Sequence, residues 1–107
     1  TITAALITIT LPTASSFSMT VKVSAQVTGT DTRAHYKRLI RGGRGGAGAS
    51  TIDDAATIGT DFDAITVAAV PTIASDGASA ITIKVTGKAA TEIDWWIMVD
   101  DCVIYSA

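Results

Sequence analysis

The chain has 107 residues, of which 48% are hydrophobic and only 6% aromatic, and a formal net charge of −2. This length fits one domain with a single core, expected over residues 1–107. The weak negative charge excludes a general electrostatic attraction to nucleic acid or anionic membranes, and no apolar run reaches the roughly 20 residues of a membrane-spanning helix. Charged residues make up only 17%, so part of the surface is expected to be covered by a partner.

Alternation of apolar and polar side chains, the period of a half-buried β-strand, recurs along the chain. It predicts strands over residues 6–11, 17–28 and 32–41, and the second alternates without a fault from Phe17 to Val27. The glycine-rich run 42–50 is expected to be a loop, because glycine weakens strands and helices alike. Residues 53–56 could hold a short turn of helix.

The second half of the chain continues in the same style. A strand is predicted to start at Ile65 and end at Pro71, and Ser75-Asp76-Gly77 is a turn signal. Residues 80–105 are interpreted as a hairpin that turns at 86–88. The pattern predicts an all-β fold without substantial helix: an antiparallel, jelly-roll-like β-sandwich of six to eight short strands.

Two adjacent tryptophans, Trp95 and Trp96, must point to opposite faces if they lie on a strand. Trp95 shares its parity with isoleucine and valine and is assigned to the core. Trp96 shares the other face with Met98, where it could contact another subunit, stack on a sugar or pack against a second sheet. A subunit contact is the favoured interpretation, which makes Trp96 and Met98 the predicted oligomer interface.

Residues that could carry chemistry are few. The single histidine, His35, has no neighbouring nucleophile motif and is interpreted as a structural or surface residue. The single cysteine, Cys102, is interpreted as buried. Asp61 and Asp63 could offer oxygens to a calcium ion, but further ligands are lacking within sequence reach. No enzyme activity, metal or cofactor is therefore expected.

The run around Arg41 and Arg44 resembles the arginine- and glycine-rich segments that contact RNA. It is one short copy without interleaved aromatic residues, in an acidic chain. A flexible loop with solvated charges is the favoured interpretation, and no nucleic-acid partner is expected.

Several short motifs follow one another in a familiar order: Leu11-Pro12, the alternating strand from Phe17 to Ala25, Ala34-x-Tyr36, a Gly/Ala/Ser loop, Asp76-Gly77, Ile83-Lys84-Val85-Thr86-Gly87 and Ile93-Asp94-Trp95. In this order the chain resembles the C-terminal β-sandwich domain of tail-fibre, tailspike and minor structural proteins of tailed bacteriophages. The resemblance implies a non-enzymatic virion protein on the particle surface. It also implies a homotrimer that assembles with other virion proteins and serves host attachment.

Two alternatives remain open. The same small sandwich could decorate a capsid. It could also be a carbohydrate-binding module of a secreted enzyme, with Tyr36 and Trp96 as stacking residues. These two side chains are likewise the candidate contacts of a virion protein with a bacterial surface glycan.

Overall fold

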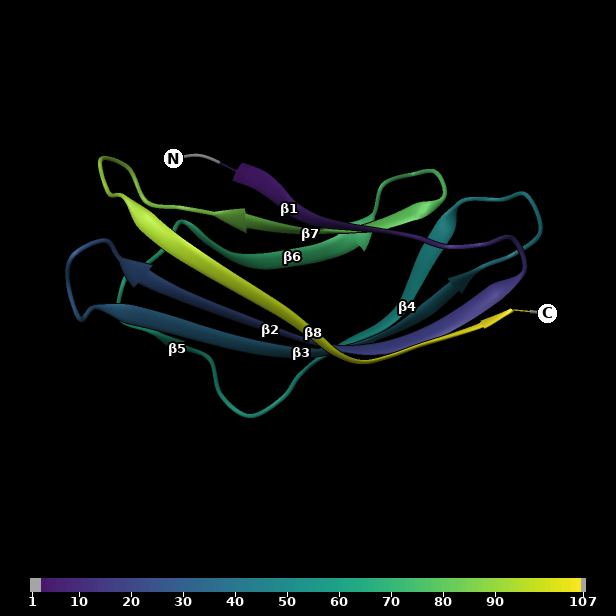
Figure 1. The fold of residues 1–107 in the computed structure, drawn as a ribbon, viewed down its shortest axis with the longest axis horizontal. Coiled ribbons are helices and arrows are strands. Elements are labelled where there is room, and N and C mark those ends of the chain that lie inside the picture. The colour runs from purple at the N-terminus through teal and green to yellow at the C-terminus, as the bar shows by residue number, and fades with distance from the viewer. Residues whose placement is uncertain (1–2, 107) are drawn as a thin grey trace.

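The structure, a computed structural model, describes residues 3–106 and is all-β, with no helix in that range. Two antiparallel sheets pack together, which confirms the predicted β-sandwich (Figure 1). No helix long and apolar enough to cross a membrane occurs in the described part of the chain. The strands are β1 (Thr3–Thr10), β2 (Ser15–Val27), β3 (Arg33–Arg44), β4 (Ser50–Thr57), β5 (Phe62–Asp63), β6 (Ala69–Ser75), β7 (Ala80–Thr86) and β8 (Ile93–Ser106).

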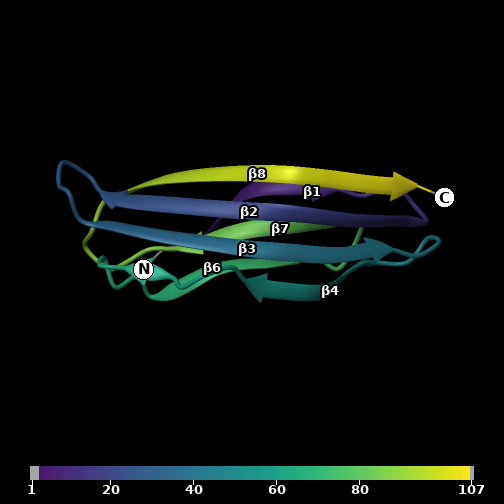
Figure 2. The same cartoon turned by 90° about the horizontal axis from the view of Figure 1, so that it is seen from below.

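The two sheets differ in size. The smaller one has the strand order β1-β7-β6, and the larger one has the order β4-β3-β2-β8, with β5 added to β3. Figure 2 looks onto the outer face of the larger sheet, where the long strands β8, β2 and β3 lie side by side. Strand β8 is therefore an edge strand that pairs with β2 alone among the described strands.

The core lies between the sheets and is built by the alternation of β2 and β7. All apolar residues at odd positions of β2 from Phe17 to Ala25 are buried, and so are Ile81, Ile83 and Val85 of β7. Burying a side chain of this size contributes roughly 1.5–3 kcal/mol. The faultless alternation in β2 is thus the sequence feature that fixes which face of the larger sheet is internal.

The predicted hairpin of residues 80–105 is wrong, because its two strands lie in different sheets. Strand β7 sits between β1 and β6 in the smaller sheet, whereas β8 pairs with β2 in the larger one. The connection over residues 87–92 crosses from one sheet to the other and includes Ala90 with a φ of 54°. The sequence signal at 86–88 marks the end of β7, whereas the turn lies at residues 88–91, closed by a hydrogen bond from the Thr91 amide to the Lys88 carbonyl oxygen. The signal does not specify which sheet the next strand joins.

The expected loop at residues 42–50 is only partly a loop, because Gly42 and Gly43 belong to β3. Both glycines are required by close backbone approach. A Cβ on Gly42 would lie 2.1 Å from the Thr51 carbonyl oxygen, and one on Gly43 would lie 2.4 Å from the Ser15 carbonyl oxygen. Glycine weakens this strand by itself, yet it is what allows β2 and β4 to flank β3 so closely.

Two further predictions are corrected. Residues 53–56 form part of β4 and not a helical turn. The strand predicted from Ile65 to Pro71 is replaced by a loop that contains Ile65, and Pro71 lies inside β6. Strand β6 is an edge strand with a register shift between Ala69 and Thr72, which is a place where a sheet tolerates proline.

Candidate interaction surface along strand β8

The two tryptophans lie on opposite faces of β8, as the alternation predicted. Trp95 is partly buried and packs against the core, whereas Trp96 is 56% exposed. Met98 is 57% exposed and shares the outer face with Trp96, since they pair with Lys22 and Ser24, which lie on the outer face of β2. The described chain therefore leaves the two predicted interface residues together and uncovered.

A β-bulge in the middle of β8 extends this apolar surface. Thr20 pairs with Asp100, but Ser18 pairs with Val103, so one extra residue is inserted in β8 and Asp101 adopts a φ of 51°. The bulge reverses the alternation of faces. Val103 (43% exposed) and Tyr105 (63%) therefore join the outer face. We call Trp96, Met98, Val103 and Tyr105 the β8 stripe.

The sequence interpretation missed the second half of the stripe because it continued the alternation through residue 100. The adjacent charges Asp100 and Asp101, where one face should have been apolar, were the available signal. Cys102, predicted to be buried, is corrected by the same feature: it is exposed, as are all residues from 101 to 106.

The neighbours of the β8 stripe on β2 are small and polar, so they do not shield it. Ser16, Ser18, Thr20 and Ser24 pair with residues of the outer face of β8. The one long neighbour, Lys22, forms an ion pair with Asp100 at 2.8 Å, and this hydrogen bond and charge raise the pKa of Lys22. The stripe thus stands above a low polar floor.

The other candidate glycan contact, Tyr36, is corrected by the structure. Its side chain is only 4% exposed and belongs to the core, on the same face of β3 as Ala34 and Ile40. Burial, with smaller contributions from Asp63 and Asp61, raises the pKa of its hydroxyl above the ordinary range. A buried ring cannot stack on a surface ligand, so Trp96 alone keeps the predicted exposure.

His35 lies on the outer face of the larger sheet, where its Nδ1 is 3.0 Å from the Ser24 hydroxyl. Its ring also faces Phe62, with 6.1 Å between the ring centroids. A hydroxyl beside an imidazole is part of a nucleophilic site, but such a site also needs a group that orients the imidazole. No carboxylate bonded to His35 is found among the described residues.

The carboxylates of Asp61 and Asp63 hold the chain around β5. Asp61 receives two hydrogen bonds from the Arg38 guanidinium, at 2.6 and 2.8 Å, which lower the pKa of that carboxyl. Asp63 accepts hydrogen bonds from three successive backbone amides, those of residues 65–67. Within residues 3–106, no group of three or more histidine, cysteine or acidic side chains is placed to hold a metal ion.

The arginines of the glycine-rich run are engaged as well. Arg41 pairs with Asp54 on the neighbouring strand β4. Arg44 donates hydrogen bonds to the carbonyl oxygens of Gly48 at 2.9 Å and Leu11 at 3.2 Å. The expected flexible loop with solvated charges is therefore wrong for Arg44, which ties the loop to the chain before β2.

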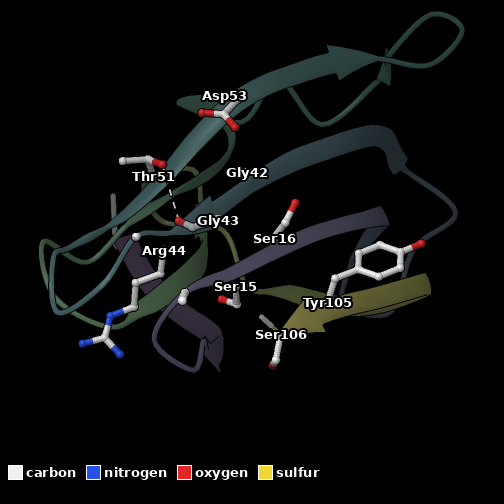
Figure 3. Close-up of a pocket in the computed structure, with 11 residues that line it drawn as sticks. Ser15, Ser16, Gly42, Gly43, Arg44, Thr51, Asp53, Tyr105 and Ser106 are labelled. Carbon is white, nitrogen blue, oxygen red and sulfur yellow. Dashed lines mark hydrogen bonds between the residues drawn. The ribbon is translucent and has the colours of Figure 1, made fainter.

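An open pocket of about 590 Å³ lies at the end of the stripe that carries Tyr105 (Figure 3). Tyr105 on β8 and Asp53 on β4 stand on opposite sides of it, Ser16 lies between them, and the Arg44 side chain points away. Gly43 contributes to the floor, and Ser15, whose buried hydroxyl has no hydrogen-bond partner among the described residues, lines the same pocket. The pocket combines an exposed aromatic ring with hydroxyl and carboxylate groups.

Comparisons with known proteins found no matching family model, no similar curated protein and no similar solved structure.

Proposed function

We propose that this chain is a non-enzymatic structural module that works by self-association through strand β8. The observation that carries the proposal is the β8 stripe: four large apolar side chains in one line, on an edge strand of a chain with few charges. Large exposed apolar patches on small domains are typical of protein interfaces.

The composition of the stripe supports this role. Tryptophan, tyrosine and methionine are enriched at the centres of protein interfaces. Next to the stripe, the outer face of β2 carries Lys22 and hydroxyl side chains, and β3 adds Lys37 and Arg41; the apolar Leu39 and Phe62 lie farther from β8. The stripe is thus an apolar line with a polar rim on one side, which is the usual anatomy of an interface.

The biological setting proposed for this association is a virion. This part rests on the order of sequence motifs that resembles phage tail-fibre and tailspike domains. A homo-oligomer at the particle surface, in contact with other virion proteins and engaged in host attachment, is consistent with that resemblance, and a capsid decoration protein is the close alternative. The resemblance implies three copies, whereas nothing in the stripe specifies that number.

The experiment is a measurement of mass in solution by analytical ultracentrifugation over a range of protein concentrations. We expect a discrete oligomer that Trp96→Glu and Met98→Glu dissociate. Phe62→Glu is a matched control, because Phe62 is 57% exposed on the same outer face but lies on β5, away from β8. A chain that stays monomeric at millimolar concentration would refute the proposal.

The pocket of Figure 3 favours carbohydrate binding as a second candidate function. The exposed ring of Tyr105 can stack on a sugar ring while Ser16 and Asp53 form hydrogen bonds with the hydroxyl groups of the sugar. Titration with neutral oligosaccharides, followed by the chemical shifts of residues near Tyr105, tests this function. Binding that persists in Tyr105→Ala would exclude the pocket as the site.

A further inference from the structure

We infer that two copies of the chain pair through the free edges of their β8 strands, antiparallel and about a twofold axis at Asp100 and Asp101. The inference rests on the proposed self-association and specifies its geometry. It is carried by the bulge, by the order of side chains on β8 and by the free edge of this strand.

The edge of β8 is long and available. The strand has 14 residues and pairs with β2 on one side only, within the part of the chain that the structure describes. The sandwich is also open on this side: a cleft of about 540 Å³ between β1, β7 and β8 exposes Leu6 and Trp95. On the opposite side, β4 contacts β6. A second strand can therefore reach the backbone of β8 without displacing any described element.

The bulge decides which registers are allowed. Before it, side chains at even positions point outward; after it, those at odd positions do so. In an antiparallel pair, opposite residues share a face. When the first half of β8 pairs with the second half of another copy, an outward residue with an even number must therefore lie opposite an outward residue with an odd number. The numbers of two opposite residues then add up to an odd sum.

Among the registers with an odd sum, the register in which opposite residue numbers add up to 201 matches the side chains best. It places Trp96 opposite Tyr105 and Met98 opposite Val103 on the outer face. On the inner face it places Ile97 opposite Ile104. A sum of 199 would put Met98 opposite Asp101, and a sum of 203 would put Asp100 opposite Val103, so both neighbouring registers set a charge against an apolar side chain. The sum of 201 also brings the two bulges together, so the strands keep equal lengths on both sides of the axis.

The area is sufficient for a reversible dimer. Trp96 and Tyr105 are each more than half exposed, and aromatic side chains of this kind can cover on the order of 100 Å² each when a partner strand lies beside them. With Met98, Val103, Ile104 and the strand edge, the total for both copies is roughly 1,000 Å², at the lower end of specific interfaces. The pair is thus expected to depend on protein concentration.

Charges at the axis oppose the pairing and provide a specific test. Asp100 of each copy is neutralised by Lys22, but no ion pair of Asp101 is found among the described residues, and it would face Asp100 of the other copy. Like charges directly opposite destabilise a strand pair. Asp101→Asn removes the charge and suits the positive φ of 51° at this position. We expect it to lower the dissociation constant at least threefold, whereas an interface that leaves this edge free would not respond.

Cysteine cross-linking tests the register, with the full chain in a Cys102→Ser background and oxidised glutathione as the oxidant. A mixture of Met98→Cys and Val103→Cys chains should give the mixed disulfide dimer, because these positions are opposite. Met98→Cys alone should not, since its two copies would be five residues apart along the ladder, roughly 16 Å.

The outcomes separate this inference from the proposed function. A dimer with the mixed cross-link supports both. An oligomer in which Met98→Cys links to itself as fast as to Val103→Cys, or a trimer without the mixed cross-link, overturns the β8 pairing and leaves self-association standing. A monomer at all concentrations overturns both.

Discussion

Gly42→Ala offers the sharpest test of how the larger sheet is built. The added Cβ would lie 2.1 Å from the Thr51 carbonyl oxygen and 3.0 Å from a ring carbon of Phe17. Ordinary contacts to a Cβ are about 1.3 Å longer than the first distance, and the obstacle is backbone, so β4 would have to move away from β3. We expect a loss of about 3 kcal/mol in the free energy of unfolding, at the upper end of overpacking effects.

The matched control lies in the same glycine run. Gly45 has no heavy atom within 4 Å of an added Cβ and no positive φ. Gly45→Ala should therefore be neutral or stabilise by up to about 1 kcal/mol, through the lower entropy of the unfolded chain. Urea denaturation followed by tryptophan fluorescence measures both. Equal stabilities of the two variants would refute the close approach of β3 and β4 at Gly42.

Three further predictions concern the tryptophans, an ion pair and a buried hydroxyl. Trp95→Ala should destabilise the fold by about 2 kcal/mol because Trp95 is partly buried, whereas Trp96→Ala should change folding by less than about 0.5 kcal/mol, as measured by urea denaturation at low protein concentration. Asp61→Asn should lower the free energy of unfolding by about 2 kcal/mol near pH 7. Because Arg38 lowers the pKa of Asp61 in the folded state, this stability is present above the unfolded pKa of roughly 4 and is lost as the pH falls through the lower folded pKa. The melting temperatures of the variant and the parent should therefore converge in acid. Tyr36→Phe should be neutral or slightly stabilising, because the buried hydroxyl has no hydrogen-bond partner among the described residues; a loss above about 1.5 kcal/mol in calorimetry would contradict this.

The faces of the strands could be predicted from the sequence, because side-chain alternation is a local property. It placed Trp95 and Trp96 correctly and identified the internal face of β2. The alternation also predicts that Tyr36 is buried, because Tyr36 shares its face of the strand with Ala34 and Ile40 and lies with them in the core. The prediction that Tyr36 contacts a glycan is wrong because its position in the alternation, and not its aromatic ring, determines whether it is exposed.

Pairing partners could not be predicted, because they depend on non-local contacts. Gly87 and Lys88 indicate that a strand ends, but they do not indicate that the chain crosses there from the smaller sheet to the larger one. The glycine pair at 42–43 has a meaning only once β2 and β4 are known to flank it. The candidate site shares this limit: Trp96 and Met98 were accessible to sequence reasoning, but Val103 and Tyr105 depend on the bulge at Asp101.

Four strands at the sheet edges, β1, β4, β6 and β8, carry an irregularity, and these irregularities limit how far an assembly can grow by strand addition. Register shifts occur in β1 near Leu6, in β4 near Asp53, in β6 near Pro71 and in β8 at Asp101. Bulges, prolines and charges on edges are means of preventing open-ended strand addition. In β8 alone the bulge falls at the middle of an apolar stripe and leaves the two halves complementary to each other. Twofold pairing there would use the β8 edge of both copies and leave exposed the edges of β1, β4 and β6, whose irregularities disfavour strand addition. Assembly through strand pairing would therefore close at two chains instead of growing into a filament.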